Sequence, residues 1–418
     1  MKVAFVNQPW NPVVPPLQSP DSIAILTHKL ALGLKPSAEV AVYGRSKFKV
    51  QNHRVDHLDY RLMPVIGDYL LLKAMAPWHR FRNAARPFFS SPLYYRGYIR
   101  QIARDLRRRH SDIVHIHTFS HFVHKIRTVC PEVKLVLHMH DNSLAFRAAD
   151  LIESQLEGVD LVLGCSNFIT NNIRIRYPEL AERCETLFNG VDAYYFQGAA
   201  ESAPPADNRP MRLLFVGRIS PEKGVHVLID AFKHVLRKYP RIQLDIIGPR
   251  WVAFKPFIDP LDKDLCLKKL NGFFEKPASY FQFLKDKLSP ADDGKVNFIG
   301  AIPHHALLYY YRRSDILINP SLCEAFGMSL VEAMACRCPV IATRVGGMID
   351  IISEGQNGVL VERDDPKALA EAILELLCNP ERRQAMGIHG RRKILELFTW
   401  QRIADSLFEK YRRLLERQ

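Results

Sequence analysis

Both halves of this 418-residue chain alternate short β-branched runs with amphipathic helical patterns. This alternation is typical of parallel sheets whose strands are connected by helices that cover the sheet faces. In the first half we predict strands at 2–6, 38–42, 113–117, 134–138 and 160–164. Helices are predicted near 22–33, 97–109 and 167–175. The fold class is therefore α/β with parallel sheets.

The second half shows the same alternation more clearly. Its strands are predicted at Leu213–Val216, Gln243–Ile247, Val296–Ile299, Asp315–Ile318, Val340–Thr343 and Val359–Val361. Its helices are predicted near 224–238, 329–335, 366–378 and 380–395, followed by an amphipathic helix at 399–417. An aromatic-rich insertion at 250–295 separates two of these strands and is longer than the usual loop of about 2–6 residues.

A segment in the middle of the chain has the composition of a linker. Residues 197–210 read QGAAESAPPADNRP and contain no large apolar residue. Since a domain typically has about 100–200 residues, two domains are expected. We predict a first domain at 1–196 and a second at 211–398, with the C-terminal helix 399–418 packing back on the first.

Composition excludes several classes of protein. The sequence contains no run of about 18 apolar residues, so no membrane-spanning helix is expected. The eight cysteines form no C-x-x-C pair, which argues against a disulfide framework or a zinc ribbon and fits a reducing cytoplasm. Neither half carries the glycine-rich signature of a dinucleotide-binding domain or of a P-loop. The net charge of +14 favours an anionic partner.

The loop after the first strand of the second half carries two cations. It reads Gly217-Arg218-Ile219-Ser220-Pro221-Glu222-Lys223-Gly224 and leads into a predicted helix. The planar guanidinium of Arg218 can grip a phosphate, and Lys223 adds a point charge. The pair suits a diphosphate without a metal, although two solvated surface cations would have the same appearance.

A second loop follows the strand Asp315–Ile318 and carries two acids. Glu324 precedes the helix, and Phe326–Ser329 supply backbone N–H groups at its N-terminus, where anions bind readily. Glu332 lies about one turn into the helix and can accept hydrogen bonds from a vicinal diol such as a ribose. An exposed loop acid and a helix-dipole partner would explain either glutamate singly, but not both beside the cationic loop.

Together these motifs resemble the family-four retaining glycosyltransferases, or glycosyl transferases group 1. The resemblance is strong across about 185–400 and weaker, but continuous, before it. It depends on Glu324-x7-Glu332 with Phe326-Gly327, Glu332-Ala333-Met334-Ala335, Gly217-Arg218, Lys223-Gly224, Pro339–Thr343, Gly346-Gly347, Asn357-Gly358, and Asn189–Asp192 with Phe196.

The resemblance implies the GT-B fold, in which two Rossmann-like domains face each other across a cleft. The first domain would serve the acceptor and the second a nucleotide-sugar donor. The implied donor-binding residues are Gly217, Arg218, Lys223, Gly300, Ile302, Glu324, Phe326, Gly327, Met328, Ser329, Leu330 and Glu332. No cofactor or metal is expected, and a UDP-sugar is slightly favoured over GDP- or ADP-sugars.

The resemblance also assigns roles within the reaction. Arg218 and Lys223 would hold the diphosphate and stabilise it as it leaves, and Glu324 would bind hydroxyls of the transferred sugar. Glu332 would bind the ribose, and backbone around 300–302 would line the base pocket. The predicted catalytic residues are Arg218, Lys223, Glu324 and His140. Retention would proceed by front-face attack of an acceptor hydroxyl, from a glycan, a glycolipid or a small molecule, on the anomeric carbon of the donor.

Six histidines fall between residues 115 and 140, namely His115, His117, His121, His124, His138 and His140. One interpretation is a metal site built from two neighbouring strands. A second follows the resemblance and makes His140 the histidine beside the reacting sugar. A third treats several of them as hydrogen-bonded structural residues.

The segment 51–110 carries twelve Lys or Arg and four acids, and thus most of the charge surplus. Its cations are interleaved with aromatic residues such as Trp78, Phe81, Phe88 and Phe89, which suits an acidic membrane surface. Arg80, Arg82 and Arg86 would contribute the charge. The alternatives are a solvated face over a covered core, or acceptor recognition, and nucleic acid is not expected. The predicted location is cytoplasmic, with possible attachment to the inner face of the membrane.

Two other functions remain open from the residues alone. One is another GT-B activity, such as a phosphorylase or an epimerase. The other is a non-catalytic basic protein that binds acidic lipid on the same scaffold. In addition, the family's Gly-Gly-x-Glu turn maps onto Pro20-Asp21-Ser22-Ile23, where no glycine stands. That departure concerns the acceptor side of the site.

Overall fold

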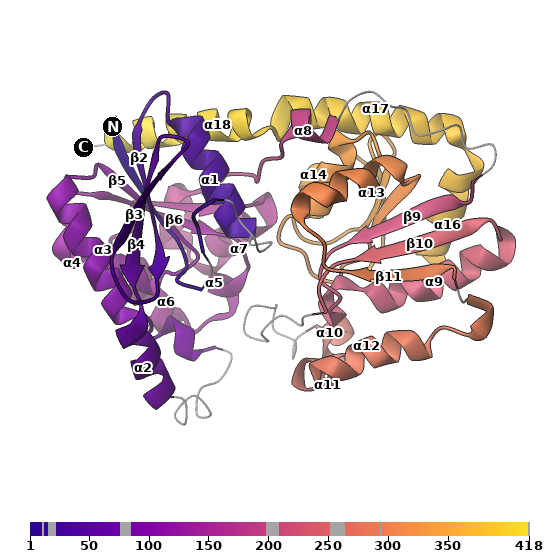
Figure 1. Cartoon of the computed structure of the whole chain (residues 1–418), viewed down its shortest axis with the longest axis horizontal. Helices are drawn as coiled ribbons and strands as arrows, with labels where there is room; N and C mark the ends of the chain where they lie inside the picture. Colours follow the sequence, from indigo (N-terminus) through magenta and orange to yellow (C-terminus); the bar gives the residue numbers. More distant parts are fainter. Residues whose placement is uncertain are drawn as a thin grey trace. The chain divides into compact units, whose positions relative to one another are not determined.

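The computed structural model describes residues 1–10, 12–15, 22–75, 85–197, 209–250, 264–292 and 294–416. They form two compact units, each with its own sheet (Figure 1). The first unit comprises Met1–Gly190 together with Trp400–Gln418, and the second comprises Val191–Thr399. Both units are Rossmann-like, with strands connected by covering helices, as the alternating pattern predicts.

The sheet of the first unit has the strand order β3-β4-β2-β1-β5-β6-β7-β8. The strands are β1 (Lys2–Val6), β2 (Glu39–Ser46), β3 (Gln51–Val55), β4 (Leu58–Pro64), β5 (Ile113–His117), β6 (Lys134–Met139), β7 (Leu161–Gly164) and β8 (Cys184–Thr186). All neighbours pair in parallel except β3 and β4. β5 and β7 are buried along their whole length, because helices cover both faces of the sheet.

The helices of the first unit are α1 (Ser22–Leu34), α2 (Ile66–Ala74), α3 (Arg96–Arg109), α4 (His121–Val129), α5 (Ser143–Phe146), α6 (Ala149–Leu156), α7 (Asn167–Arg176) and α18 (Trp400–Glu416). α18, from the far end of the chain, lies against α1 (Figure 1). Gly33 allows this approach, since a Cβ there would lie 2.4 Å from the Cβ of Ala404. Leu407 and Tyr411 of α18 join the core over β1.

The sheet of the second unit is wholly parallel, in the order β11-β10-β9-β12-β13-β14. Its strands are β9 (Met211–Val216), β10 (Ile242–Ile247), β11 (Val296–Gly300), β12 (Ile316–Asn319), β13 (Val340–Thr343) and β14 (Val359–Val361). Its helices are α8 (Ala193–Gln197), α9 (Val225–Lys238), α10 (Leu265–Lys268), α11 (Asn271–Glu275), α12 (Pro277–Asp286), α13 (Leu307–Arg313), α14 (Met328–Ala335), α15 (Met348–Ile351), α16 (Pro366–Cys378) and α17 (Pro380–Leu397). No helix in the described ranges is both long enough and apolar enough to cross a membrane.

The structure differs from the sequence prediction in several places, and helices α2, α4, α6 and α13 are among the elements that were not predicted. β3, β4 and β8 were not predicted, and β3 adds an antiparallel edge to the first sheet. Residues 191–196, expected in the first domain, belong to the second unit, because the Phe196 ring packs on Tyr311 there. The insertion after β10 is partly helical, and Leu267 and Tyr280 join the core of the second unit. Residues 198–208 of the predicted linker lie outside the described residues.

Candidate active site

The loop after β9 carries the two predicted cations. Gly217 follows the strand, the chain passes Arg218, and a single 3₁₀ turn at Pro221–Lys223 leads to α9. Gly224, with φ of +66°, caps this helix, and a Cβ there would lie 2.0 Å from the carbonyl oxygen of Pro320. Glycine is therefore needed where this loop meets the loop after β12.

The loop after β12 carries Glu324. Because β12 is the parallel neighbour of β9, the two loops leave the sheet at the same edge. Gly346 supports the loop from behind: its φ is +54°, and a Cβ there would lie 1.7 Å from the backbone oxygen of Glu324. That oxygen accepts a hydrogen bond of 3.1 Å from the N–H of Gly347. The backbone under Glu324 is thus fixed.

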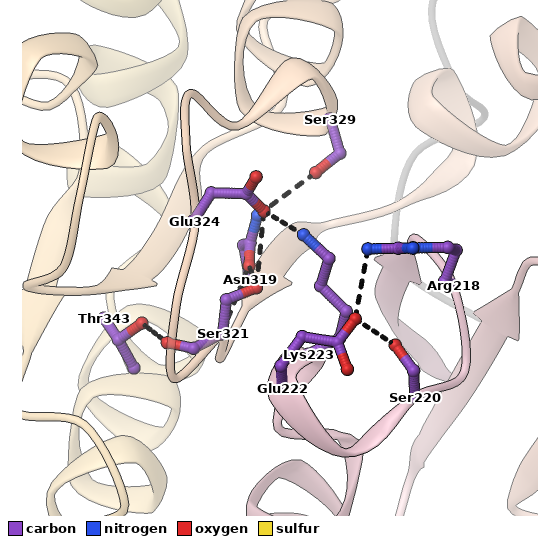
Figure 2. A network of polar contacts seen from close by, with 9 residues as sticks. All are labelled: Arg218, Ser220, Glu222, Lys223, Asn319, Ser321, Glu324, Ser329 and Thr343. Atoms are coloured by element: carbon purple, nitrogen blue, oxygen red, sulfur yellow. Dashed lines mark hydrogen bonds and ion pairs between the residues drawn. The ribbon is translucent and has the colours of Figure 1, made fainter. Parts of the chain in front are cut away.

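The two loops are joined by an ion pair between Lys223 and Glu324. Nζ of Lys223 lies 2.7 Å from Oε2 of Glu324, and both side chains are 15% exposed (Figure 2). Burial opposes the charged form of Glu324, but the Lys223 ammonium, the Arg218 charge and the Asn319 amide together hold its pKa below the ordinary value. Glu324 is therefore ionised at neutral pH.

Arg218 is paired with an acid that the sequence analysis did not single out. Its guanidinium lies 3.1 Å from Oε1 of Glu222, which also accepts a bond of 2.6 Å from the Ser220 hydroxyl (Figure 2). Glu222 is 3% exposed, whereas the Arg218 side chain is 31% exposed. The buried acid thus anchors a guanidinium that remains open to solvent. The spacing of four residues between them was the available signal.

A chain of polar side chains fixes the acidic loop to the sheet. The Ser321 hydroxyl donates to Oδ1 of Asn319 over 2.7 Å, and the Thr343 hydroxyl donates to the carbonyl of Ser321 (Figure 2). Nδ2 of Asn319 lies 3.5 Å from Oγ of Ser329, at the start of α14. The loop is therefore tied to β13 and to the helix that follows it.

Apolar side chains around the start of α14 are buried in the core of the second unit. Gly327 adopts φ of +109° and precedes the helix, while Phe326 is 2% exposed and Leu330 is fully buried. The Phe326 ring packs on Phe398. Met328 is half-buried. Any contact of Phe326 or Leu330 with a ligand would therefore be through the backbone, as the sequence analysis expected.

Glu332 is bound by two partners of its own. It is 5% exposed, and its Oε2 accepts a bond of 2.6 Å from the hydroxyl of Tyr311 on α13. Its Oε1 lies 2.7 Å from Nε2 of His304. Neither partner was predicted, because both come from a different element. Burial and the Glu332 charge raise the Tyr311 pKa well above its ordinary value, so this phenol remains a donor.

The predicted base-pocket loop leads directly to His304. Gly300 ends β11 with φ of +85°, and its carbonyl accepts the N–H of Gly248 over 2.9 Å. Ile302 is half-buried two residues later. The loop therefore places the predicted base-binding residues next to the partner of Glu332 within one unit.

The histidine cluster lies in the first unit. One ring nitrogen from each of His115, His117 and His138 falls within 4.8 Å of the others, and all three are fully buried. Burial lowers their pKa values well below 6.5, so they are neutral. His115 lies 2.6 Å from the Tyr411 hydroxyl, and His117 lies 2.9 Å from His140. These contacts are what the structural interpretation expects.

His140 follows β6 at its carboxyl end. Its Nε2 faces Nδ1 of His117, and burial lowers its pKa to about 3. A neutral imidazole can donate or accept one hydrogen bond toward a sugar hydroxyl, but it carries no charge at pH 7. Its role beside the reacting sugar remains a prediction.

The basic segment is more involved in the fold than the sequence analysis expected. Phe88 and Phe89, expected to enter a membrane interface, are 8% and 6% exposed and pack in the core, so that expectation is wrong for them. Several of the cations are paired with acids: Arg61 with Asp105, Arg109 with Asp59, and Arg86 with Asp150. Trp78, Arg80, Phe81 and Arg82 lie outside the described residues.

Comparison with known proteins gives the same assignment for both units. The model of the glycosyl transferases group 1 matches residues 199–393, and that of Glycosyltransferase Family 4 matches residues 38–194. The chain is 25% identical to the spore coat protein SA of Bacillus subtilis over 75% of this chain and 81% of that protein. It is 30% identical to the D-inositol 3-phosphate glycosyltransferase of Corynebacterium urealyticum over 63% of this chain and 59% of that enzyme.

Solved structures show the same architecture. The Anabaena protein HepE, determined in complex with UDP, superposes with a TM-score of 0.68 over 99% of this chain and 100% of its own, at 16% identity. This likeness shows the fold, and the family models show the class of enzyme. The chain is therefore a glycosyltransferase with the GT-B fold, a member of the glycosyl transferases group 1.

Proposed function

We propose that this enzyme transfers a sugar from a nucleoside-diphosphate sugar to an acceptor hydroxyl with retention of configuration and without a bound metal. The observation that carries the proposal is the meeting of Lys223 and Glu324 at 2.7 Å across 101 residues of sequence. A cation for a diphosphate and an acid for sugar hydroxyls are the two groups that such a donor requires on either side of its scissile bond.

The cations have partners that a diphosphate can replace. Lys223 pairs with Glu324, and Arg218 pairs with Glu222, so each cation already lies beside anionic oxygens. A diphosphate carries more charge than one carboxylate and can accept a bidentate contact from Arg218. Its arrival would release Glu324 to bind sugar hydroxyls. The N–H groups at the start of α14 would add positive potential from the other side.

Charge stabilisation is the main catalytic demand of this reaction. As the glycosidic bond breaks, the bond electrons go to the β-phosphate oxygen, and Arg218 and Lys223 offset the charge that develops there. The acceptor hydroxyl then attacks the same face of an oxocarbenium-like centre and passes its proton to the departing β-phosphate oxygen. These cations make a metal unnecessary. We name no residue as a nucleophile.

The nucleotide of the donor is proposed from the residues around Glu332 and from a structure that shares the fold. Glu332 can accept hydrogen bonds from the ribose hydroxyls, and the loop with Gly300 and Ile302 leads to His304, which contacts Glu332. HepE, which shares the fold, was determined in complex with UDP. A UDP-sugar is therefore slightly favoured over GDP- and ADP-sugars. A sugar, a lipid or a small molecule is the proposed acceptor, in the cytoplasm.

Thermal unfolding with added ligands tests the donor proposal. A nucleotide at 100 times its Kd should stabilise the fold by about 2.7 kcal/mol. We expect one of UDP, GDP and ADP to raise Tm more than the other two. Donor hydrolysis with and without candidate acceptors then tests transfer, and stereochemistry at the anomeric carbon tests retention. No shift with any nucleotide would reject the proposed donor site, whereas phosphate-dependent cleavage would favour a phosphorylase.

A second proposal concerns the surface formed by α2 and the start of α3. Tyr69 and Leu70 of α2 are 58% and 60% exposed. Leu71 of the same helix lines a hollow of about 430 Å³ together with Asp68, Arg96 and Arg100. Exposed apolar side chains next to cations suit the surface of an anionic bilayer, where each cation contributes about 1 kcal/mol. We propose that this surface attaches the enzyme to such a membrane. It takes the place of Phe88 and Phe89, which were predicted from the sequence to contact the membrane but are buried.

Liposome flotation tests this attachment. The wild type should float with phosphatidylserine vesicles at low salt and be released at high salt, because salt screens surface charges. Leu70→Asp should lower the floating fraction severalfold. Ile388→Asp, at a position that is 51% exposed on α17 of the other unit, is the matched control and should float like the wild type. Flotation of Leu70→Asp equal to that of the control would contradict the proposed surface.

A further inference from the structure

His304 occupies the oxygen of Glu332 that a ribose would need. Its Nε2 lies 2.7 Å from Oε1, while Oε2 is bonded to Tyr311. A carboxylate can only accept hydrogen bonds, so Nε2 carries the hydrogen in this contact. Both oxygens of the predicted ribose acid therefore already have a protein donor.

The two donors differ in how easily they can be replaced. Tyr311 is 1% exposed and lies on a regular helix, α13, so its bond to Glu332 is a permanent part of the core. The His304 side chain is 39% exposed and lies in a single 3₁₀ turn between β11 and α13. A ligand can reach the histidine side of Glu332 but not the tyrosine side.

The position of the His304 ring is itself defined by packing. Its ring stands edge-on to Phe196, with centroids 5.7 Å apart, and Phe196 in turn contacts Tyr311. His304 is therefore placed with its Nε2 toward Glu332 by an aromatic neighbour. A rotation about its side-chain torsions would move the imidazole toward solvent and expose Oε1, while Tyr311 keeps the carboxylate in place.

We propose that His304 is a positioning residue that competes with the donor ribose for Glu332. It rests on the proposed function, because Glu332 must be the ribose acid. Without donor, the imidazole supplies the hydrogen bond that the buried carboxylate requires. When a nucleoside diphosphate binds, its ribose diol replaces His304 at Oε1. The donor affinity is then the difference between the ribose bond and the histidine bond.

The competition predicts an unusual direction of effect. Removing His304 should strengthen ribonucleotide binding, because the ribose would then displace only solvent from Oε1. The gain should be about three- to tenfold, the scale of one ordinary protein hydrogen bond after solvent compensation. A nucleotide that lacks both ribose hydroxyls should gain nothing. The donor KM should fall while kcat changes less than about twofold.

Calorimetric titration with UDP and 2′,3′-dideoxy-UDP tests this in the full-length enzyme. In His304→Ala, the Kd for UDP should fall about three- to tenfold, and the Kd for the dideoxy analogue should stay within about twofold. His304→Gln, which keeps an N–H donor, should retain the wild-type preference. His305→Ala, at the next and exposed residue of the same turn, is the matched control.

The outcomes separate this inference from the proposed function. If the wild type binds none of UDP, GDP and ADP, both fall together. If GDP or ADP binds instead of UDP, the titrations use that nucleotide and its 2′,3′-dideoxy analogue. Tight nucleotide binding that weakens in His304→Ala, or that changes equally for both analogues, would overturn the competition and leave the donor site standing.

Discussion

Nζ of Lys223 and Oε2 of Glu324 lie 2.7 Å apart, although the two residues are 101 positions apart in the sequence. Their loops follow β9 and β12, which are parallel neighbours, so they leave the sheet at one edge. In the absence of substrate, the positive charge of Lys223 and the negative charge of Glu324 neutralise each other. It keeps a buried acid ionised and gives a diphosphate a cation that is already in position.

The first prediction concerns the two cations of the loop after β9. Arg218→Ala or Lys223→Ala should lower the transfer rate by about 10²–10³, the effect of losing one donor to the charge that develops in the transition state. Arg237→Ala, an exposed cation in the last turn of α9, should leave the rate unchanged. Wild-type rates in purified Arg218→Ala and Lys223→Ala would remove this assignment.

The second prediction concerns the pH dependence of stability. The pKa of Glu324 is lowered in the folded state, so its ion pair stabilises the fold above the pKa of an unfolded glutamate, about 4.3, and is lost in more acidic solution. In Lys223→Met, the carboxylate loses the largest of the interactions that oppose burial, so its pKa rises and its ionisation contributes less to stability as pH rises. The Tm difference between wild type and Lys223→Met should therefore grow from pH 4 to pH 7.

The size of this difference can be bounded. Leaving a buried charge without its partner costs several kcal/mol, and about 1 kcal/mol corresponds to roughly 2–4 °C in a unit of this size. Calorimetric scans of both proteins at four pH values measure it. A constant difference across the range would mean that Lys223 acts through packing rather than through the charge on Glu324.

Strands β10, β12, β13 and β14 of the second unit were predictable because nearly all of their residues are buried. A short, continuous apolar run between turn residues is typical of a strand buried on both faces. The β3–β4 hairpin was not, since its turn uses Asp56 and His57 with positive φ instead of the usual Asn-Gly. β3 also has three exposed residues among its five. A polar edge strand with an unusual turn residue gives no periodic signal.

The candidate site likewise contains residues that could be predicted from the sequence and residues that could not. Arg218, Lys223, Glu324 and Glu332 were found because their motifs are local in sequence. Tyr311 and His304 were missed, because nothing local marks them as partners of Glu332. Contacts that depend on which helix packs on which appear only once the fold brings them together.

The third prediction separates the two glutamates. Glu332→Ala should weaken binding of a bare nucleoside diphosphate, because the ribose loses its acceptor. Glu324→Ala should leave that affinity nearly unchanged and lower kcat by about 10²-fold or more, since its proposed partner is the sugar. Calorimetry with the nucleotide and kinetics with the sugar donor measure the two effects. Equal losses of nucleotide affinity in both variants would contradict this division of roles.

The fourth prediction concerns metal. Transfer should be unchanged within about twofold in excess EDTA, because Arg218, Lys223 and the start of α14 already offset the diphosphate charge. The control is a second chelator with a different metal preference. Complete loss of activity, restored by one divalent ion, would overturn metal independence. The cluster of His115, His117 and His138 would then become the first place to look for that ion.

The last prediction concerns Gly346, which supports the Glu324 loop. An alanine there meets two obstacles: a φ of +54°, and a Cβ only 1.7 Å from the Glu324 carbonyl oxygen. Gly355 is the matched control, since its φ is +74° but a Cβ there would meet nothing within 4 Å. Gly355→Ala should therefore cost only the strain of a left-handed residue, about 1–2 kcal/mol.

Gly346→Ala should cost more and should also displace Glu324 from Lys223, because the clash is with the backbone of the acidic loop itself. We expect a lower Tm than in Gly355→Ala and a loss of transfer of at least about tenfold, the effect of misplacing a catalytic group by about 1 Å or less. Nucleotide binding through Glu332 should persist, since that acid lies on α14 and is held by Tyr311. If both variants lose the same stability and keep full activity, the contact with Gly346 does not position Glu324.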